Sequence, residues 1–195
     1  MRKKGMIRYV SVMAVIASLT GCANMAVTGA QAVYNRHSIE KDFKDQHITM
    51  QAFKALKIND KRFKNSHIAI ATFNQEVLLA GQVPEPWQAK EAQTIVSSIP
   101  DIKHVYNLLE VAGPSSTIKK MSDSWITAKV KAKIIASDDV DATKVKVVTE
   151  NGTVYLMGVL PKEEADEAVK LASFTDGVER VVKVFSYVKI YKEHG

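Results

Sequence analysis

The chain has 195 residues, of which 46% are apolar, and a formal net charge of +6. Four of its 27 basic residues lie in the first 21 positions, which contain no acid, so the rest of the chain carries 23 bases against 21 acids. A balance this close to neutral argues against a protein that binds nucleic acid through a basic surface. The single cysteine excludes a disulfide within the chain.

The N-terminal segment has the composition of a secretion signal. A basic stretch that ends at Arg8 is followed by a run of 11 mostly apolar residues at positions 9–19. A helix needs about 20 apolar residues to span a bilayer, so this run is too short to be a transmembrane helix. The sequence therefore predicts a signal peptide at residues 1–21.

The apolar run ends in Leu19-Thr20-Gly21-Cys22, which resembles a bacterial lipobox, although Ala or Ser is more usual than Thr at its second position. The alternative is an ordinary signal peptide with an incidental cysteine. The position of the only cysteine favours the lipobox, which implies a lipidated Cys22 whose acyl chains anchor the protein firmly. Ala23 replaces the Asp that retains lipoproteins in the inner membrane, so we expect an outer-membrane protein on the periplasmic face.

An internal repeat organises the rest of the chain. Residues 145–161 predict a β-hairpin, because Asn151-Gly152 is a strong two-residue turn signal between alternating apolar residues. Residues 68–84 align with this segment without a gap. The matched positions are Thr72, Asn74, Val77, Leu79, Gly81 and Pro84 with Thr149, Asn151, Val154, Leu156, Gly158 and Pro161.

The repeat extends beyond the hairpin in both directions. Upstream, Asp45 and Asp123 each precede apolar residues at helical spacing, which predicts that each aspartate caps the N-terminus of a helix. Downstream, matched alanines predict a second helix, and a Val-x-x-Val or Ile-x-x-Val motif leads into a last strand. We expect five segments: signal peptide 1–21, lipidated tether 22–44, first repeat 45–112, linker 113–121 and second repeat 122–191.

Each repeat resembles a BON domain. The residues that carry the resemblance are the Leu-x-Gly motifs at Leu79 and Leu156, the alanines of the second helix and the valines before the last strand. The resemblance implies an α+β fold with two tandem BON domains. Each would be αββαβ, with a three-stranded mixed sheet packed on two helices. Signal, lipobox and two BON units together resemble the dual-BON outer-membrane lipoproteins. The first repeat departs from the pattern, since Gln75 replaces the turn glycine.

The segment 123–135 predicts an amphipathic helix with a second face. Ile126, Val130 and Ile134 form the core stripe, which is complete without Trp125. Tryptophan and lysine beside a partly apolar face are typical of a helix at a membrane surface. The alternative is that Trp125 packs between the repeats and that the lysines are only solvated. The predicted face comprises Trp125, Ala128, Lys129, Lys131, Ala132, Lys133 and Ile135.

In the dual-BON lipoproteins the first helix of the second domain contacts anionic phospholipid, and the matching positions here are Trp125, Lys129 and Ile135. The resemblance thus implies a protein that binds phosphatidylglycerol or cardiolipin and supports outer-membrane integrity. A periplasmic adaptor for an envelope assembly machine is the alternative, with envelope proteins as partners. We also expect Tyr155, Met157, Phe185 and Tyr187 to be covered by the first repeat, since together they are too apolar to face water.

The sequence predicts no enzyme, no cofactor and no metal site. The histidines lack metal-ligand spacing, and no nucleophile and base can be paired. Asp138, Asp139, Asp141 and Glu150 resemble a calcium loop, but the sixth position is Lys144 and not glycine, so we interpret this segment as a turn.

Overall fold

The structure is a computed structural model that describes residues 29–57, 61–113 and 117–188. The predicted signal peptide and Cys22 lie outside the described residues. The chain divides into one unit up to Ile39 and a second from Glu40 onward, which contains both repeats. Within the described ranges, no helix combines the length and the apolar character that crossing a membrane requires.

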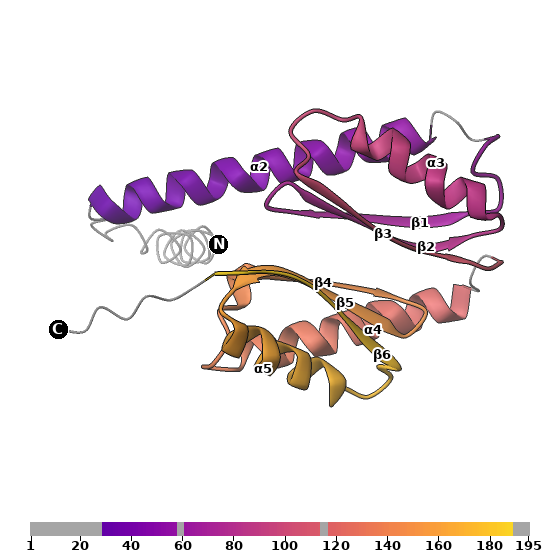
Figure 1. Cartoon of the computed structure of the whole chain (residues 1–195). Helices are drawn as coiled ribbons and strands as arrows, with labels where there is room; N and C mark the ends of the chain where they lie inside the picture. The colour runs from indigo at the N-terminus through magenta and orange to yellow at the C-terminus, as the bar shows by residue number, and fades with distance from the viewer. Residues whose placement is uncertain (1–28, 58–60, 114–116, 189–195) are drawn as a thin grey trace, which may run out of the picture. The chain divides into compact units, whose positions relative to one another are not determined.

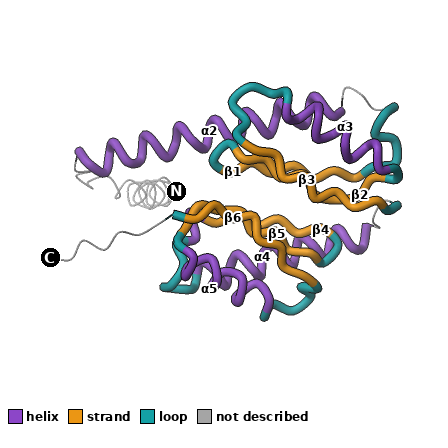
Figure 2. Tube along the Cα trace, in the orientation of Figure 1, coloured by secondary structure: helices purple, strands orange, loops and turns teal. Residues whose placement is uncertain are grey.

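The first repeat is built from two helices and one mixed sheet, which can be followed in Figures 1 and 2. Helix α2 (Gly29–Lys57) leads into the hairpin of β1 (His67–Phe73) and β2 (Glu76–Val83). Helix α3 (Pro86–Ser97) then crosses back to β3 (His104–Val111). Strand β2 is central, antiparallel to β1 and parallel to β3. Because parallel neighbours need a crossover, α3 lies on the sheet between them.

The second repeat has the same topology. It runs through α4 (Thr117–Ile135), the short 3-10 helix η1 (Ala142–Lys144), β4 (Val145–Glu150), β5 (Thr153–Leu160), α5 (Lys162–Ser173) and β6 (Arg180–Tyr187). Strand β5 is again central, antiparallel to β4 and parallel to β6. The expected α+β fold of two αββαβ units, each with a three-stranded mixed sheet, is confirmed.

Both hairpins turn through residues with positive φ. Asn151 and Gly152 have φ of 48° and 72°, and Asn74 and Gln75 have 52° and 67°. Two positive φ values in a row are the signature of the turn that the Asn-Gly signal predicts. Glutamine is poorly suited to this conformation, because its Cβ crowds the backbone where glycine has none.

The aspartates expected to cap helices have a different role. Helix α2 begins at Gly29 and α4 at Thr117, so Asp45 and Asp123 lie inside helices and the N-cap prediction is wrong. The Asp123 carboxylate instead accepts the N–H groups of Asn151 and Gly152, both at 2.8 Å. Asp45 does the same for the first hairpin turn, at 2.6 and 2.7 Å. Each aspartate ties a helix to its hairpin.

These helix starts also change the expected connections between domains. Part of the predicted tether, residues 29–44, belongs to α2, and part of the predicted linker, residues 117–121, belongs to α4. Residues 114–116 of the predicted linker lie outside the described part of the chain. The helices extend N-terminally because residues 30–44 and 117–121 contain neither proline nor glycine, the two residues that most disfavour a helix.

We predict that Gln75→Gly stabilises the first repeat by about 1 kcal/mol, because glycine adopts the positive φ of this position without steric cost. The measurement is the midpoint of urea or thermal unfolding of the variant against the parent chain. Gln93→Gly, in helix α3, is the matched control and should lower stability by about 1 kcal/mol. A Gln75→Gly variant no more stable than the parent would show that the turn carries no strain.

The helix-facing side of each sheet is the core of its repeat. In the second repeat, Val147, Val154 and Leu156 pack against Val130 and Ala168. In the first repeat the core is the corresponding set, which is Ile48, Ala52, Leu56, Val77, Leu79, Ala92, Val96 and Val105. Ala92 of α3 and Ala165, Ala168 and Ala172 of α5 are fully buried, because a larger side chain would hold the helix away from the sheet.

The opposite faces of the two sheets share a third cluster. Tyr155 and Met157, 3% and 1% exposed, pack with Leu78 of the first repeat. Their predicted burial against the first repeat is confirmed. The prediction is wrong for Phe185, which pairs in register with Gly158 and packs on the helix side, and for Tyr187, which is 54% exposed. Parallel pairing puts Val182 and Val184 beside Tyr155 and Met157 instead.

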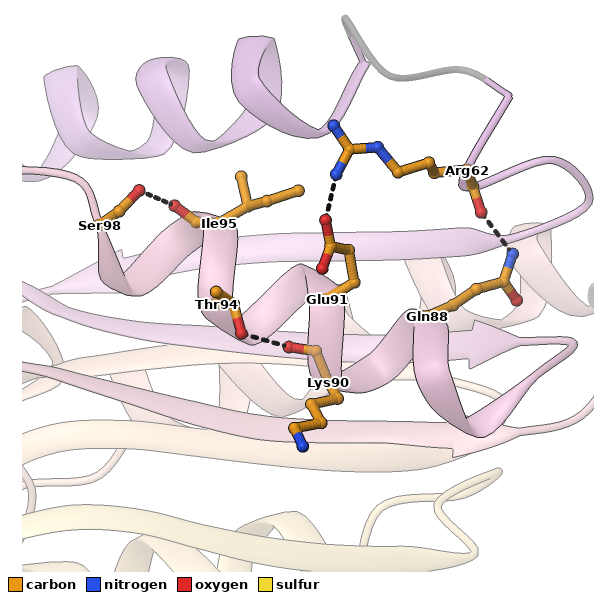
Figure 3. A network of polar contacts seen from close by, with 7 residues as sticks. All are labelled: Arg62, Gln88, Lys90, Glu91, Thr94, Ile95 and Ser98. Carbon is orange, nitrogen blue, oxygen red and sulfur yellow. Dashed lines mark hydrogen bonds and ion pairs between the residues drawn. The ribbon is translucent and has the colours of Figure 1, made fainter.

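Helix α3 is fixed at its N-terminus by polar contacts (Figure 3). The buried Gln88 side chain accepts the N–H of Glu85 at 2.9 Å and donates to the carbonyl of Arg62 at 2.7 Å. The Arg62 guanidinium forms an ion pair with Glu91 on the next turn. The buried amide is thereby satisfied at both ends, and the segment before β1 is tied to α3.

Candidate functional site

Helix α4 presents two faces of different character. The predicted core stripe is buried, with Ile126, Val130 and Ile134 at 3%, 0% and 2% exposure. Trp125 precedes this stripe and is 71% exposed. The alternative in which Trp125 packs between the repeats is therefore wrong. The tryptophan contributes little to the core, and its ring is available to a partner.

The outer face of α4 exposes further apolar side chains. Met121 and Ile135 are 69% and 72% exposed, one near each end of the helix. Ala128 and Ala132, which lie between Met121 and Ile135 along the helix, are also exposed, and their short side chains project little from the surface. An apolar face in water has an unfavourable free energy that is recovered when a partner covers it. Met121 therefore belongs to this face, although the face predicted from the sequence did not include it.

The three predicted lysines are all exposed. The Lys129 ammonium donates to the backbone carbonyl of Asp176, and that of Lys133 to the carbonyl of Phe174, both at 2.5 Å. An ammonium has three donors, so each of these groups keeps two for an anionic ligand. The carbonyls lie just past the C-terminus of α5, where the helix dipole favours positive charge. Lys129 and Lys133 are thus held in place along one edge of the exposed face.

Phe174 belongs to the same surface and was missed from the sequence. It follows α5 directly and is 75% exposed, more than any other large apolar side chain described. Its backbone carbonyl accepts a hydrogen bond from the Lys133 ammonium on α4. The available signal was the repeat itself, because the aligned position in the first repeat is Ser98. Because the first repeat has the same fold with a serine at this position, a role in the core does not explain the phenylalanine.

The first repeat lacks this set of side chains. His47, Gln51 and Ala55 stand where the second repeat has Trp125, Lys129 and Lys133. In their place is a hollow of about 590 Å³ between α2 and the turn before β3. Its apolar lining comes mainly from Phe43, Met50 and Pro100. The two repeats therefore share a fold but present different surfaces at the same helix.

The acidic segment after α4 is a turn, as expected. The Asp141 carboxylate accepts from the backbone N–H and the hydroxyl of Thr143, at 3.1 and 2.6 Å, and so caps η1. These hydrogen bonds lower the pKa of Asp141. Among the described residues, no group of three or more His, Cys, Asp and Glu side chains is arranged to hold a metal ion.

The comparisons with known proteins agree with the internal repeat. The sequence matches the BON domain family twice, over residues 44–113 and 122–189. Each match spans one αββαβ unit. Together they account for most of the chain.

Three curated relatives are similar over much of their length. The outer membrane lipoprotein DolP of Haemophilus influenzae is 30% identical over 87% of this chain and 90% of its own. The 21 kDa hemolysin of Actinobacillus pleuropneumoniae is 35% identical over 65% of both chains. The osmotically-inducible protein Y of Escherichia coli is 30% identical over 72% of this chain and 71% of its own. The chain therefore belongs to the BON-domain family, and its two tandem BON domains group it with the dual BON-domain lipoproteins.

Proposed function

We propose that this protein is a non-catalytic lipoprotein of the outer membrane, which binds anionic phospholipid through α4 of its second BON domain and supports outer-membrane integrity. The observation that carries the proposal is the exposed face of α4, where the solvent-exposed Trp125 is followed one and two turns later by Lys129 and Lys133. Tryptophan is favoured at the headgroup level of a bilayer, and lysine is attracted to anionic headgroups.

The expected strength of this contact is modest. Partial insertion of one tryptophan contributes a few kcal/mol, and each lysine near an anionic surface adds about 1 kcal/mol. Such a contact is weak for a protein in solution. A lipid anchor on the same chain would raise its effective concentration at the membrane, so that a weak contact is occupied most of the time.

The anchor is the second part of the proposal. The lipobox Leu19-Thr20-Gly21-Cys22 supports a lipidated Cys22, and the relative DolP is named an outer membrane lipoprotein. Cys22→Ala is expected to leave the signal peptide uncleaved by the lipoprotein peptidase or to release the protein from membranes. The measurement is fractionation of cells followed by the intact mass of the protein. Ser18→Ala, within the apolar run, is the control and should be processed normally.

A mass that retains residues 1–21 in the mature protein would contradict the anchor. A protein that begins at Cys22 without acyl chains would contradict it as well. Neither result touches the lipid-binding face of α4, which is tested separately because it uses residues of the second BON domain.

The adaptor function has its own supporting observation, the hollow lined by Phe43, Met50 and Pro100 in the first BON domain. Pelleting with vesicles separates the two functions. A lipid-binding protein without its anchor pellets with vesicles that contain phosphatidylglycerol and stays in solution with phosphatidylcholine alone. An adaptor that needs a protein partner stays in solution with both.

A further inference from the structure

The loop between α5 and β6 lies along helix α4. Lys133 is hydrogen-bonded to the carbonyl of Phe174, and Lys129 to that of Asp176. At Gly177 an added Cβ would come within 3.1 Å of the Ile126 side chain. As the loop advances from Phe174 to Gly177, its contacts therefore step back along α4 from Lys133 to Ile126. The loop and the helix form one surface.

This pairing separates the two aromatic side chains along the helix. Phe174 is level with Lys133, whereas Trp125 is two turns nearer the N-terminus. Eight residues of α-helix rise roughly 12 Å. The two aromatic side chains, 75% and 71% exposed, therefore lie at opposite ends of a surface that carries the Lys133 ammonium beside Phe174 and the Lys129 ammonium between the two ends.

The surface matches the chemistry of an anionic bilayer. Its cations come from Lys129 and Lys133, which are both exposed. The apolar groups at its ends are aromatic, and an aromatic ring can enter the headgroup region while lysines contact phosphates beside it. A single inserted side chain leaves a domain free to rotate about it, but two points about 12 Å apart define a line and so fix how the helix lies on the membrane.

The first BON domain lacks the whole set. Ser98 aligns with Phe174, Gln51 and Ala55 with the two lysines, and His47 with Trp125. If Phe174 served the fold, the first domain, which has the same fold, would need an apolar residue at Ser98. Its joint occurrence with Trp125 and the lysines indicates that the four side chains act together.

We infer that Phe174 is a second membrane-contact residue, and that Lys129 and Lys133 position its loop against α4, so that the second BON domain docks on an anionic bilayer through two elements and not through the helix alone. This inference rests on the proposed lipid-binding function. It adds a contact outside the first helix and an orientation, with α4 lying flat and the α5–β6 loop directed into the headgroups.

The test uses single-tryptophan reporters in the full chain, reconstituted with vesicles of phosphatidylglycerol and phosphatidylcholine. Trp87→Phe leaves Trp125 as the only tryptophan, and Phe174→Trp together with Trp87→Phe and Trp125→Phe puts the only tryptophan at position 174. The control has its only tryptophan at position 98, through Ser98→Trp in the same background. The measurement is the emission maximum and its quenching by phospholipids brominated along the acyl chains.

The inference predicts a blue shift and quenching for the reporters at positions 125 and 174, with the reporter at position 98 unchanged. A response at position 125 without one at position 174 overturns the role of Phe174 and leaves the proposed function intact. The absence of a response at both positions overturns the proposed function and the inference with it. Equal quenching at positions 174 and 98 also overturns the inference, because the contact would then not be specific to this surface.

Discussion

Trp125→Glu is expected to abolish binding of the chain, without its anchor, to vesicles that contain phosphatidylglycerol. The substitution removes the apolar group that enters the headgroup region and adds a negative charge to an anionic surface, so both contributions are lost together. A loss of a few kcal/mol weakens binding on the order of a hundredfold or more. The fold should be unaffected, because the ring is 71% exposed and the core stripe of α4 remains complete.

The matched control for this variant is Trp87→Glu. Trp87 is also exposed, at 51%, but it lies on α3 of the first BON domain. Its replacement should leave vesicle binding unchanged, so a loss in both variants would point to a general effect of charge. Circular dichroism and the unfolding midpoint are measured for both. If Trp125→Glu unfolds the domain, or if it binds vesicles like the parent chain, the membrane role of Trp125 is wrong.

Gly81→Ala is expected to cost the first BON domain about 2–5 kcal/mol, the sum of backbone strain and steric overlap. Gly81 has a φ of +114°, which residues with a Cβ rarely adopt. A Cβ at this position would lie 2.2 Å from the carbonyl oxygen of His67 on the paired strand. Neither backbone can move without disturbing the hairpin, so the cost cannot be relieved by a rotamer change.

Gly158 is the equivalent position in the second BON domain. Its added Cβ would meet the carbonyl oxygen of Lys144 at 2.5 Å, so Gly158→Ala should destabilise that domain as well. The control is Gly113→Ala, where nothing lies within 4 Å of the added atom. Unfolding midpoints should fall for the two strand variants and stay unchanged for the control. A Gly81→Ala variant as stable as Gly113→Ala would contradict the close backbone approach.

The repeat made most of the fold predictable from one sequence. The Asn-Gly turn fixed the register of the second hairpin, since a two-residue turn leaves Thr149 opposite Val154, as the structure has them. The aligned copy then located the same hairpin in the first domain, where Gln75 obscures the turn signal. The sheet-facing stripe of α4 followed from its apolar spacing, which left Trp125 outside that stripe but did not decide between exposure to solvent and packing between the repeats.

Three features depend on tertiary contacts that periodicity does not contain. Asp123 satisfies a hairpin turn 28 residues away along the chain and not its own helix, and aspartate is equally suited to both. Phe185 faces the helices because its strand pairs in parallel with β5, and a strand can alternate in either register. Phe174 joins the candidate site through the contact of its loop with Lys133, which no spacing rule connects.

Cosedimentation of residues 23–195 with vesicles, at rising salt, tests the lipid-binding claim most directly. We predict that the chain pellets with vesicles containing phosphatidylglycerol, that it stays in solution with phosphatidylcholine alone, and that the bound fraction falls as salt rises, because exposed charges are screened within about 10 Å at 0.1 M salt and about 3 Å at 1 M. Equal binding to both kinds of vesicle, binding that salt does not change, or no binding to either would contradict recognition of anionic phospholipid by the face of α4.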